Sequence, residues 1–154
     1  MANIEILKAE PPDLQKILEI QKSAFLDEGR AAGGIPISPL VEGPEDLEAD
    51  FKKLTILKAV DEDGEIIGSV RGKKEGGTVF VYRLSVKPER RKKGAGGLLL
   101  DALEKELPSA RYELRTRRGN DKAENLYRKH GYRAFKEEFG EGDIVLVSYE
   151  KTPE

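Results

Sequence analysis

The 154-residue sequence predicts a single α/β domain with a mixed, mostly antiparallel, twisted sheet of about six or seven strands. Two observations lead to this fold class. Apolar, β-type segments at 55–60, 66–73 and 78–86 are separated by short glycine-containing turns, which predicts an antiparallel meander. Strand–helix–strand patterns on either side of a glycine-rich stretch at 94–97 predict that helices cover both faces of the sheet.

The N-terminal part is expected to contain one strand and two helices. Alternation over 3–9 favours a short strand, and apolar residues at helical spacing over 14–25 favour a helix. Gly29 is expected to end this helix. The glycine- and proline-rich segment 29–43 is expected to be a long loop, of a kind that is often functional, and Pro44 to begin the second helix.

The C-terminal part follows from apolar periodicity and from the glycines and prolines between its segments. Strands are expected at 112–116, 132–137 and 144–150, and helices at 98–107 and 120–130. Residues 1–151 are expected to form one domain, and 152–154 a frayed tail.

The composition excludes several classes of site. Cysteine is absent and there is one histidine, so disulfides and thiolate chemistry are excluded and a metal site or Ser-His triad is poorly supplied. We expect no metal. No apolar run approaches 18 residues and the first residues do not form a signal-peptide pattern, so we expect a cytoplasmic protein without a membrane partner.

Charge is distributed unevenly along the chain. Residues 1–65 carry 7 basic and 15 acidic side chains (net −8), whereas 66–136 carry 19 and 8 (net +11) and 137–154 carry 1 and 6 (net −5). A basic middle between acidic ends favours a local anionic ligand over a polyanion that contacts the whole surface. No nucleic-acid-binding motif is present, so we expect no nucleic-acid partner.

The segment 86–98 carries the strongest chemical signal. It combines the end of a strand, four consecutive basic residues and three glycines at the beginning of a helix. Free N–H groups and the positive dipole end of such a helix bind phosphate, and glycine allows close approach to the backbone. The alternative is a solvated loop. Walker and Rossmann glycine patterns are both absent.

Two motifs resemble those of the GNAT N-acetyltransferase superfamily. The first is Arg91-x-x-Gly94-x-Gly96, preceded by Leu84-Ser85-Val86-Lys87-Pro88, and the second is Asn120-x-x-Ala123-x-x-Leu126-Tyr127-x-x-x-Gly131-Tyr132. The resemblance covers 55–137 well. It implies the GNAT fold, in which the two central strands, here 78–86 and 112–116, splay apart in a V.

The resemblance also implies acetyl-CoA as co-substrate and direct attack of a primary amine on the thioester in a ternary complex, with no covalent enzyme intermediate. Tyr127 takes the position of the general acid, and Asn120 that of a contact to the pantetheine arm. Backbone groups of Leu84 and Val86 would pair with the same arm. The pyrophosphate would bind the backbone of Arg91, Lys92, Lys93, Gly94, Ala95, Gly96 and Gly97.

The general base is the point at which this sequence departs from the superfamily. Many members carry a glutamate on the strand before the glycine turn, but here Phe80 occupies that position. Tyr82, a water chain, Asp27 or Glu28 could serve instead.

Three flanking arginines and the histidine complete the candidate residues. Arg115, Arg117 and Arg118 either contact the 3′-phosphate of coenzyme A or are solvated. His130 is expected to complement a helix dipole rather than to act in catalysis.

The acceptor is the least constrained part of the interpretation. Acidic residues in and around the 29–43 loop and the 137–142 turn favour a cationic amine, such as a polyamine, an aminoglycoside or a basic peptide end. A non-catalytic acyl-CoA-binding or sensing module on the same fold remains the alternative function. We expect a monomer or a homodimer.

Overall fold

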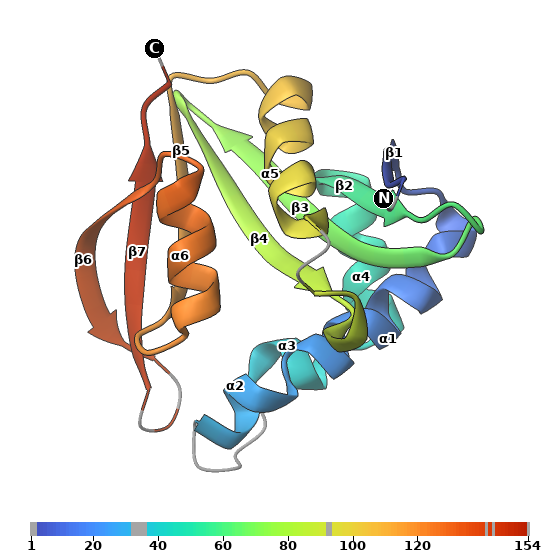
Figure 1. The fold of residues 1–154 in the computed structure, drawn as a ribbon, viewed down its shortest axis with the longest axis horizontal. Coiled ribbons are helices and arrows are strands. Elements are labelled where there is room, and N and C mark those ends of the chain that lie inside the picture. The colour runs from blue at the N-terminus through green and yellow to red at the C-terminus, as the bar shows by residue number, and fades with distance from the viewer. Residues whose placement is uncertain (1–2, 32–36, 92–93, 141, 143, 154) are drawn as a thin grey trace.

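The computed structural model describes residues 3–31, 37–91, 94–140, 142 and 144–153. Its centre is a seven-stranded sheet with the order β1-β2-β3-β4-β5-β7-β6 (Figure 1). The strands are β1 (Glu5–Lys8), β2 (Thr55–Val60), β3 (Ile66–Glu75), β4 (Thr78–Val86), β5 (Arg111–Arg117), β6 (Arg133–Phe139) and β7 (Val145–Lys151). All neighbouring strands are antiparallel except β4 and β5, which are parallel. The predicted mixed sheet is therefore confirmed.

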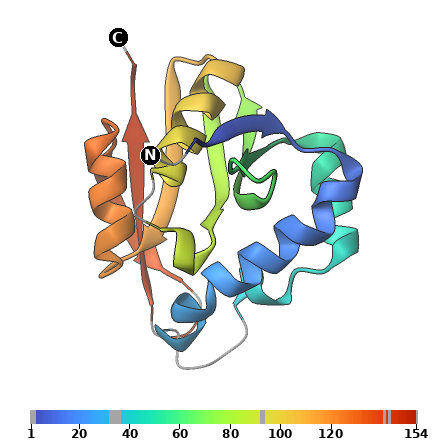
Figure 2. The ribbon, with the colours of Figure 1, turned by 45° about the vertical axis from the view of Figure 1, so that its right-hand side comes forward.

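Helices cover both faces of this sheet, as predicted. They are η1 (Pro11–Asp13), α1 (Leu14–Ala24), α2 (Leu26–Ala31), α3 (Ser38–Val41), α4 (Pro44–Lys53), η2 (Pro88–Arg90), α5 (Ala95–Glu106) and α6 (Asp121–Lys129). One core lies under α5 and α6 and the other under α1 and α4. Figure 2 shows the orange α6 and the teal α4 on opposite sides of the molecule. None of the helices in the described ranges is long and apolar enough to cross a membrane.

The two central strands separate after a short paired segment. Thr78, Val79 and Phe80 of β4 pair in parallel with β5, and the last of these pairs joins Phe80 to Glu113. Beyond it the strands diverge, so the β5-facing edge of β4 has no strand partner over 81–86 (Figure 1). The predicted V between 78–86 and 112–116 is confirmed.

A bulge in β4 lies in the part that has left β5. Ser69 of β3 pairs with Ser85, but Arg71 pairs with Tyr82, so two residues of β4, Arg83 and Leu84, stand opposite one residue of β3. Arg83 has a φ of 52° and is the only described non-glycine residue with a positive φ. Bulges bend and twist a strand, so this one redirects the backbone at the open side of the V.

The N-terminal helices differ from the prediction at Gly29. The first helix ends at Ala24, and α2 then runs through Gly29, whose N–H donates to the carbonyl of Phe25 at 3.1 Å. A Cβ on Gly29 would lie 2.5 Å from Leu40 of α3. The glycine therefore permits close packing of α3 rather than ending a helix. The predicted 29–43 loop is correspondingly shorter, because it contains the end of α2 and all of α3.

A buried ion network fastens α1 and α4 to the sheet. Arg71 of β3 is 1% exposed, and its Nη1 lies 2.8 Å from carboxylate oxygens of both Glu42 and Asp50. Its other terminal nitrogen donates to Gln21 of α1. The second Glu42 oxygen accepts from Arg83 at 3.3 Å, so the network reaches the β4 bulge. Removing Glu42 would leave the buried Arg71 with one carboxylate partner in place of two.

We predict that Glu42→Gln destabilises the fold by about 3 kcal/mol at neutral pH, as breaking a buried ion pair typically does. Burial raises the pKa of Glu42, but the charge and hydrogen bond of Arg71, with the charge of Arg83, outweigh it and leave the pKa lowered. The carboxylate's contribution is therefore present above about pH 4.3 and is lost as pH falls through the lower folded pKa.

Urea unfolding at neutral and acidic pH would measure this effect. Glu48→Gln is the control, because Glu48 is an exposed residue of α4, the helix that carries Asp50 of the network. The loss of unfolding free energy in Glu42→Gln, relative to wild type, should become smaller as the pH is lowered. If Glu42→Gln and Glu48→Gln lose the same unfolding free energy at neutral pH, the network does not stabilise the fold.

Gly68 of β3 packs closely against β4 just beyond the bulge. Gly68 pairs with Val86, and a Cβ there would lie 2.8 Å from the backbone oxygen of Ser85, which cannot move without shifting β4. We expect Gly68→Ala to lower the free energy of unfolding by about 1–3 kcal/mol. Gly77→Ala is the control, because a Cβ there meets nothing within 4 Å. Equal unfolding midpoints for the two variants would contradict the prediction.

Candidate active site

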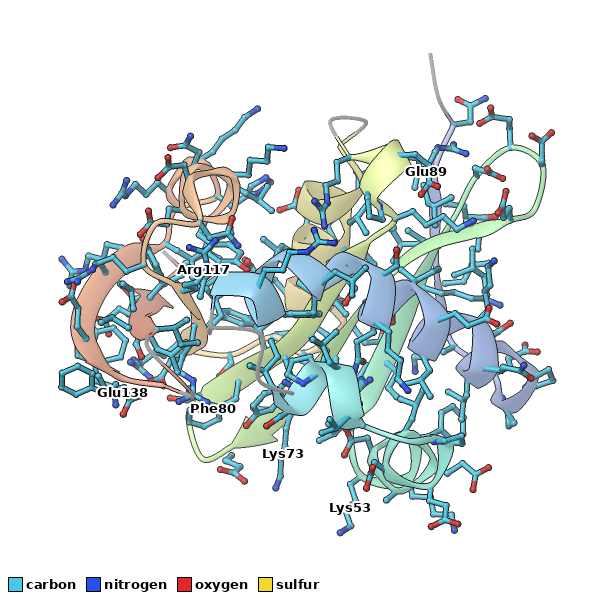
Figure 3. All side chains as sticks on the ribbon, turned by 90° about the horizontal axis from the view of Figure 1, so that it is seen from below. Lys53, Lys73, Phe80, Glu89, Arg117 and Glu138 are labelled. Atoms are coloured by element: carbon cyan, nitrogen blue, oxygen red, sulfur yellow. The ribbon has the colours of Figure 1, made fainter. Side chains whose placement is uncertain are left out.

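The divergence of β4 and β5 opens a cleft of about 1520 Å³. Its walls combine both strands with the first turn of α5, the inner side of α6 and parts of α1, α3 and α4. In Figure 3, which views the molecule from below, Phe80, Lys73 and Lys53 follow one another along one side. All three line the cleft, and Lys73 and Phe80 are register partners on β3 and β4.

The N-terminus of α5 opens into this cleft. Gly94 is its N-cap residue, with a φ of 85°, a left-handed conformation that favours glycine. No side chain in the described part of the chain caps the helix, so the N–H groups of its first turn are available to a ligand. A Cβ on Gly94 would meet nothing within 4 Å, which leaves open space before these donors.

The next two glycines have a packing role that the sequence did not indicate. A Cβ on Gly96 would lie 3.1 Å from Leu126, and one on Gly97 would lie 2.6 Å from Nε2 of His130. Both neighbours belong to α6 or its C-cap, so these glycines let α5 and α6 approach closely. His130 also contacts Asp101 of α5 at 3.2 Å, which makes it a contact between helices as well as a helix-end residue.

The residues on either side of the glycine turn line the cleft or connect the turn to α1. Leu84 and Val86 line the cleft at and beyond the bulge, and Ala95 lines it in the first turn of α5. Arg91 donates through Nη2 to the carbonyl of Ala24 at 3.0 Å, which ties the turn to the end of α1. Lys92 and Lys93 lie outside the described residues.

Both candidate residues of the second motif lie on the cleft wall. Asn120 is the N-cap of α6: its Oδ1 accepts from the N–H of Ala123 at 3.3 Å, and its Nδ2 lies 3.5 Å from Thr116 Oγ1. Tyr127 is 7% exposed and packs edge-on against Tyr149, with ring centroids 5.7 Å apart. The helix therefore presents the amide near its start and the tyrosine two turns later.

Of the candidate bases named from the sequence, the structure describes the side chain of Tyr82 alone. Burial and the negative charge of Glu75 raise the pKa of Tyr82, so its phenol stays protonated at neutral pH. The side chains of Asp27 and Glu28 lie outside the described residues. The carboxylates that line the described cleft are Asp50, Glu113 and Asp121. Within the described ranges, no three His, Asp or Glu side chains are grouped in a way that could hold a metal.

The flanking arginines of β5 reach different partners. Arg115 pairs with Glu138 at 3.1 Å and Arg118 with Glu137 at 3.2 Å, both across to β6. Arg115 and Arg117 line the cleft, but Arg118 does not. Ion pairs on the surface therefore engage two of the three side chains that we considered for the 3′-phosphate.

The acidic acceptor wall expected from the sequence is not found in the described cleft, whose lining is mostly basic among its charged residues. Glu42 is buried in the network with Arg71, Asp46 accepts from the N–H of Gly43 at 2.8 Å, and Glu138 pairs with Arg115. None of these three lines the cleft. Glu141 lies outside the described residues.

Several solved structures share this architecture. The PaiA N-acetyltransferase from Thermoplasma acidophilum, in complex with coenzyme A, is 23% identical over 98% of this chain and 99% of that chain, with a TM-score of 0.76. The ribosomal-protein-S18-alanine N-acetyltransferase from Escherichia coli is 16% identical over 97% and 94%, with a TM-score of 0.79. A phosphinothricin acetyltransferase from Sinorhizobium meliloti, in complex with AcCoA, is 18% identical over 97% and 88%, with a TM-score of 0.79.

These likenesses establish the fold, and the sequence itself establishes the family. No curated protein sequence shows a significant match. The model of the Acetyltransferase (GNAT) family matches residues 14–132, a span that runs from α1 to the residue before β6 and includes both sides of the cleft. The chain therefore belongs to the GNAT acetyltransferase family.

Proposed function

We propose that the protein is an acetyl-CoA-dependent N-acetyltransferase that acetylates a primary amine of a small molecule or peptide by direct attack in a ternary complex. One observation carries this proposal: the unpaired edge of β4 and the N-terminus of α5, which no described side chain caps, open into the same cleft. An extended acyl-carrying chain with a pyrophosphate group needs both features. Acetyl-CoA would supply the thioester, whose acetyl group is transferred.

The phosphate end of the cofactor fits the α5 terminus. The N–H groups of the first turn and the positive end of the helix dipole favour an anion, and the open space at Gly94 admits one. Arg90 and Arg91 line the same part of the cleft and add positive charge, although Arg90 also pairs with Asp61 at 2.9 Å and Arg91 bonds to the backbone of α1. These groups would orient the pyrophosphate.

The pantetheine arm would lie along the free edge of β4. Beyond Phe80 that edge has no strand partner, and backbone groups of an extended segment bind another extended chain in the manner of an added strand. Leu84 and Val86 supply these groups at and after the bulge. Asn120 faces the arm from the opposite wall, with its carbonyl oxygen already engaged by the helix cap.

Tyr127 is proposed as the general acid. Its ring is fixed by Tyr149 and Tyr132, while the residue borders the cleft. A tyrosine hydroxyl is a hydrogen-bond donor and can pass its proton to a departing thiolate.

A non-catalytic acyl-CoA-binding module is the alternative, favoured by the absence of a carboxylate on β4. Thiol release measured with a panel of primary amines distinguishes the two. The enzyme should release coenzyme A only when an amine is present, whereas the binding module releases none. Because the charged residues that line the described cleft are mostly basic, the panel should include amino acids and other anionic amines beside polyamines.

We predict that acetyl-CoA raises the melting temperature and that Gly94→Asp abolishes the shift. At a hundredfold excess over Kd, ligand binding stabilises the native state by about 2.7 kcal/mol. An aspartate at the N-cap is compatible with the left-handed backbone and with the helix, so the free protein should fold. Its carboxylate would occupy the phosphate position and repel the ligand.

Thermal unfolding over a series of acetyl-CoA concentrations measures this shift. Gly94→Ala is the matched control, because it adds a side chain at the same left-handed position without the charge. It should retain a clear shift, and equal shifts for the two variants would show that the α5 terminus does not hold the phosphates.

We predict that Tyr127→Phe lowers turnover at least ~10-fold while leaving stabilisation by acetyl-CoA unchanged. The substitution keeps the ring and its contacts with Tyr149 and Tyr132. Tyr149→Phe is the control, because Tyr149 belongs to the same cluster but donates its hydroxyl to Glu124 at 2.9 Å and does not line the cleft. Equal turnover in wild type and Tyr127→Phe would reduce Tyr127 to a packing residue.

A further inference from the structure

We propose that Glu113 of β5 is the general base that takes the proton from the acceptor amine. This inference rests on the proposed function, because it concerns the same reaction. Many members of the superfamily carry the basic glutamate at the position that Phe80 occupies here. A carboxylate on the neighbouring strand takes over its role.

The register of the two central strands places Glu113 beside Phe80. The two residues form the last pair before β4 and β5 separate, so Glu113 lies where the V begins. Neighbouring strands run about 4.8 Å apart, a distance that a glutamate side chain can span. A carboxylate absent from β4 is therefore available one strand away.

Alternation along β5 sets the side of the sheet that Glu113 occupies. Its neighbours Tyr112 and Leu114 belong to the core under α5 and α6, so Glu113 points to the opposite face. Phe80 also points there, because Val79 and Val81 belong to the same core. Glu113 lines the cleft on this face, and its side chain is 18% exposed.

An arginine holds the Glu113 carboxylate in place. Arg111 Nη1 lies 2.9 Å from Glu113, while Nε of the same guanidinium lies 3.0 Å from Glu150 on β7. The Arg111 guanidinium also lies over the ring of Phe135, 5.1 Å from its centroid. The acid is thus oriented by a group that is itself fixed from two sides.

The other two carboxylates of the described cleft are less suited to this role. Asp50 lies on α4 and is bound at 2.8 Å to the buried Arg71, within the network that fastens the helix to the sheet. Asp121 lies in the first turn of α6, where the helix dipole stabilises its negative charge. Neither lies at the point where the strands divide.

The proposed step balances its protons as follows. An acceptor ammonium gives one proton to Glu113, directly or through one water, and Glu113 later releases it to solvent. The neutral nitrogen forms a bond to the thioester carbonyl carbon, and the carbon–sulfur bond then breaks with its electron pair on sulfur. Tyr127 gives the thiolate a proton, and the second proton lost by nitrogen restores the phenol.

Glu113→Gln tests the assignment, with Glu150→Gln as its control. Glu150 is the cross-strand partner of Glu113, binds the same arginine, and has a side chain that is 21% exposed, but it does not line the cleft. Each variant therefore removes one ion pair of Arg111. We expect kcat/KM to fall ~10²-fold or more in Glu113→Gln and far less in Glu150→Gln, with an unchanged thermal shift by acetyl-CoA in both and an intermediate kcat/KM in Glu113→Asp.

The pH profile separates a base from a structural residue. Without its base, the enzyme depends on amine that is already neutral in solution. The difference in kcat/KM between wild type and Glu113→Gln should therefore become smaller as pH rises toward the pKa of the amine. The assignment would be overturned, while the proposed function stands, if the loss of kcat/KM in Glu113→Gln did not change with pH or equalled the loss in Glu150→Gln. A wild type that binds acetyl-CoA and transfers acetyl to no amine would overturn both.

Discussion

The separation of β4 from β5 is the constraint on which the site depends. A parallel pair that continued past Phe80 and Glu113 would satisfy the backbone of both strands and leave no cleft. Instead, the bulge at Arg83 bends β4, and α5 and α6 cover the core on one face of the divided sheet, where Gly96 and Gly97 face the C-terminal end of α6. The unpaired edge of β4 is thereby exposed to a ligand rather than to another strand.

The walls of the cleft are held by different physical means. On the α5 and α6 side, Gly96 and Gly97 allow close approach of the helices, and His130 contacts Asp101 across the junction. On the α1 and α4 side, Arg71 joins acids and an amide from three other segments. Close packing holds the α5 and α6 side of the cleft, and buried ion pairs hold the α1 and α4 side. The first should be sensitive to added side-chain volume, and the second to loss of charge and to pH.

Local signals explain which parts of the fold could be predicted. The ranges of β2 and β4 follow from apolar alternation and the start of α4 from Pro44, since these patterns reflect backbone geometry and the face that each element buries. The prediction that Gly29 ends a helix was wrong, because a glycine can either terminate a helix or allow another element to pack closely against it. Only the position of Leu40 shows which use applies. The partners of Glu42 were equally hidden, because they lie on three separate elements.

The sequence by itself determined the meander, the glycine turn before α5 and the two motifs that indicated the family, because each depends on residues close together in the chain. Tertiary structure alone decided which charges meet. The described acids that we expected at the acceptor wall do not line the cleft. Glu113 lies beside Phe80, because β4 and β5 pair in parallel at this point. Residues 33 positions apart meet there because of strand register, which results from packing of the whole sheet and not from any local pattern.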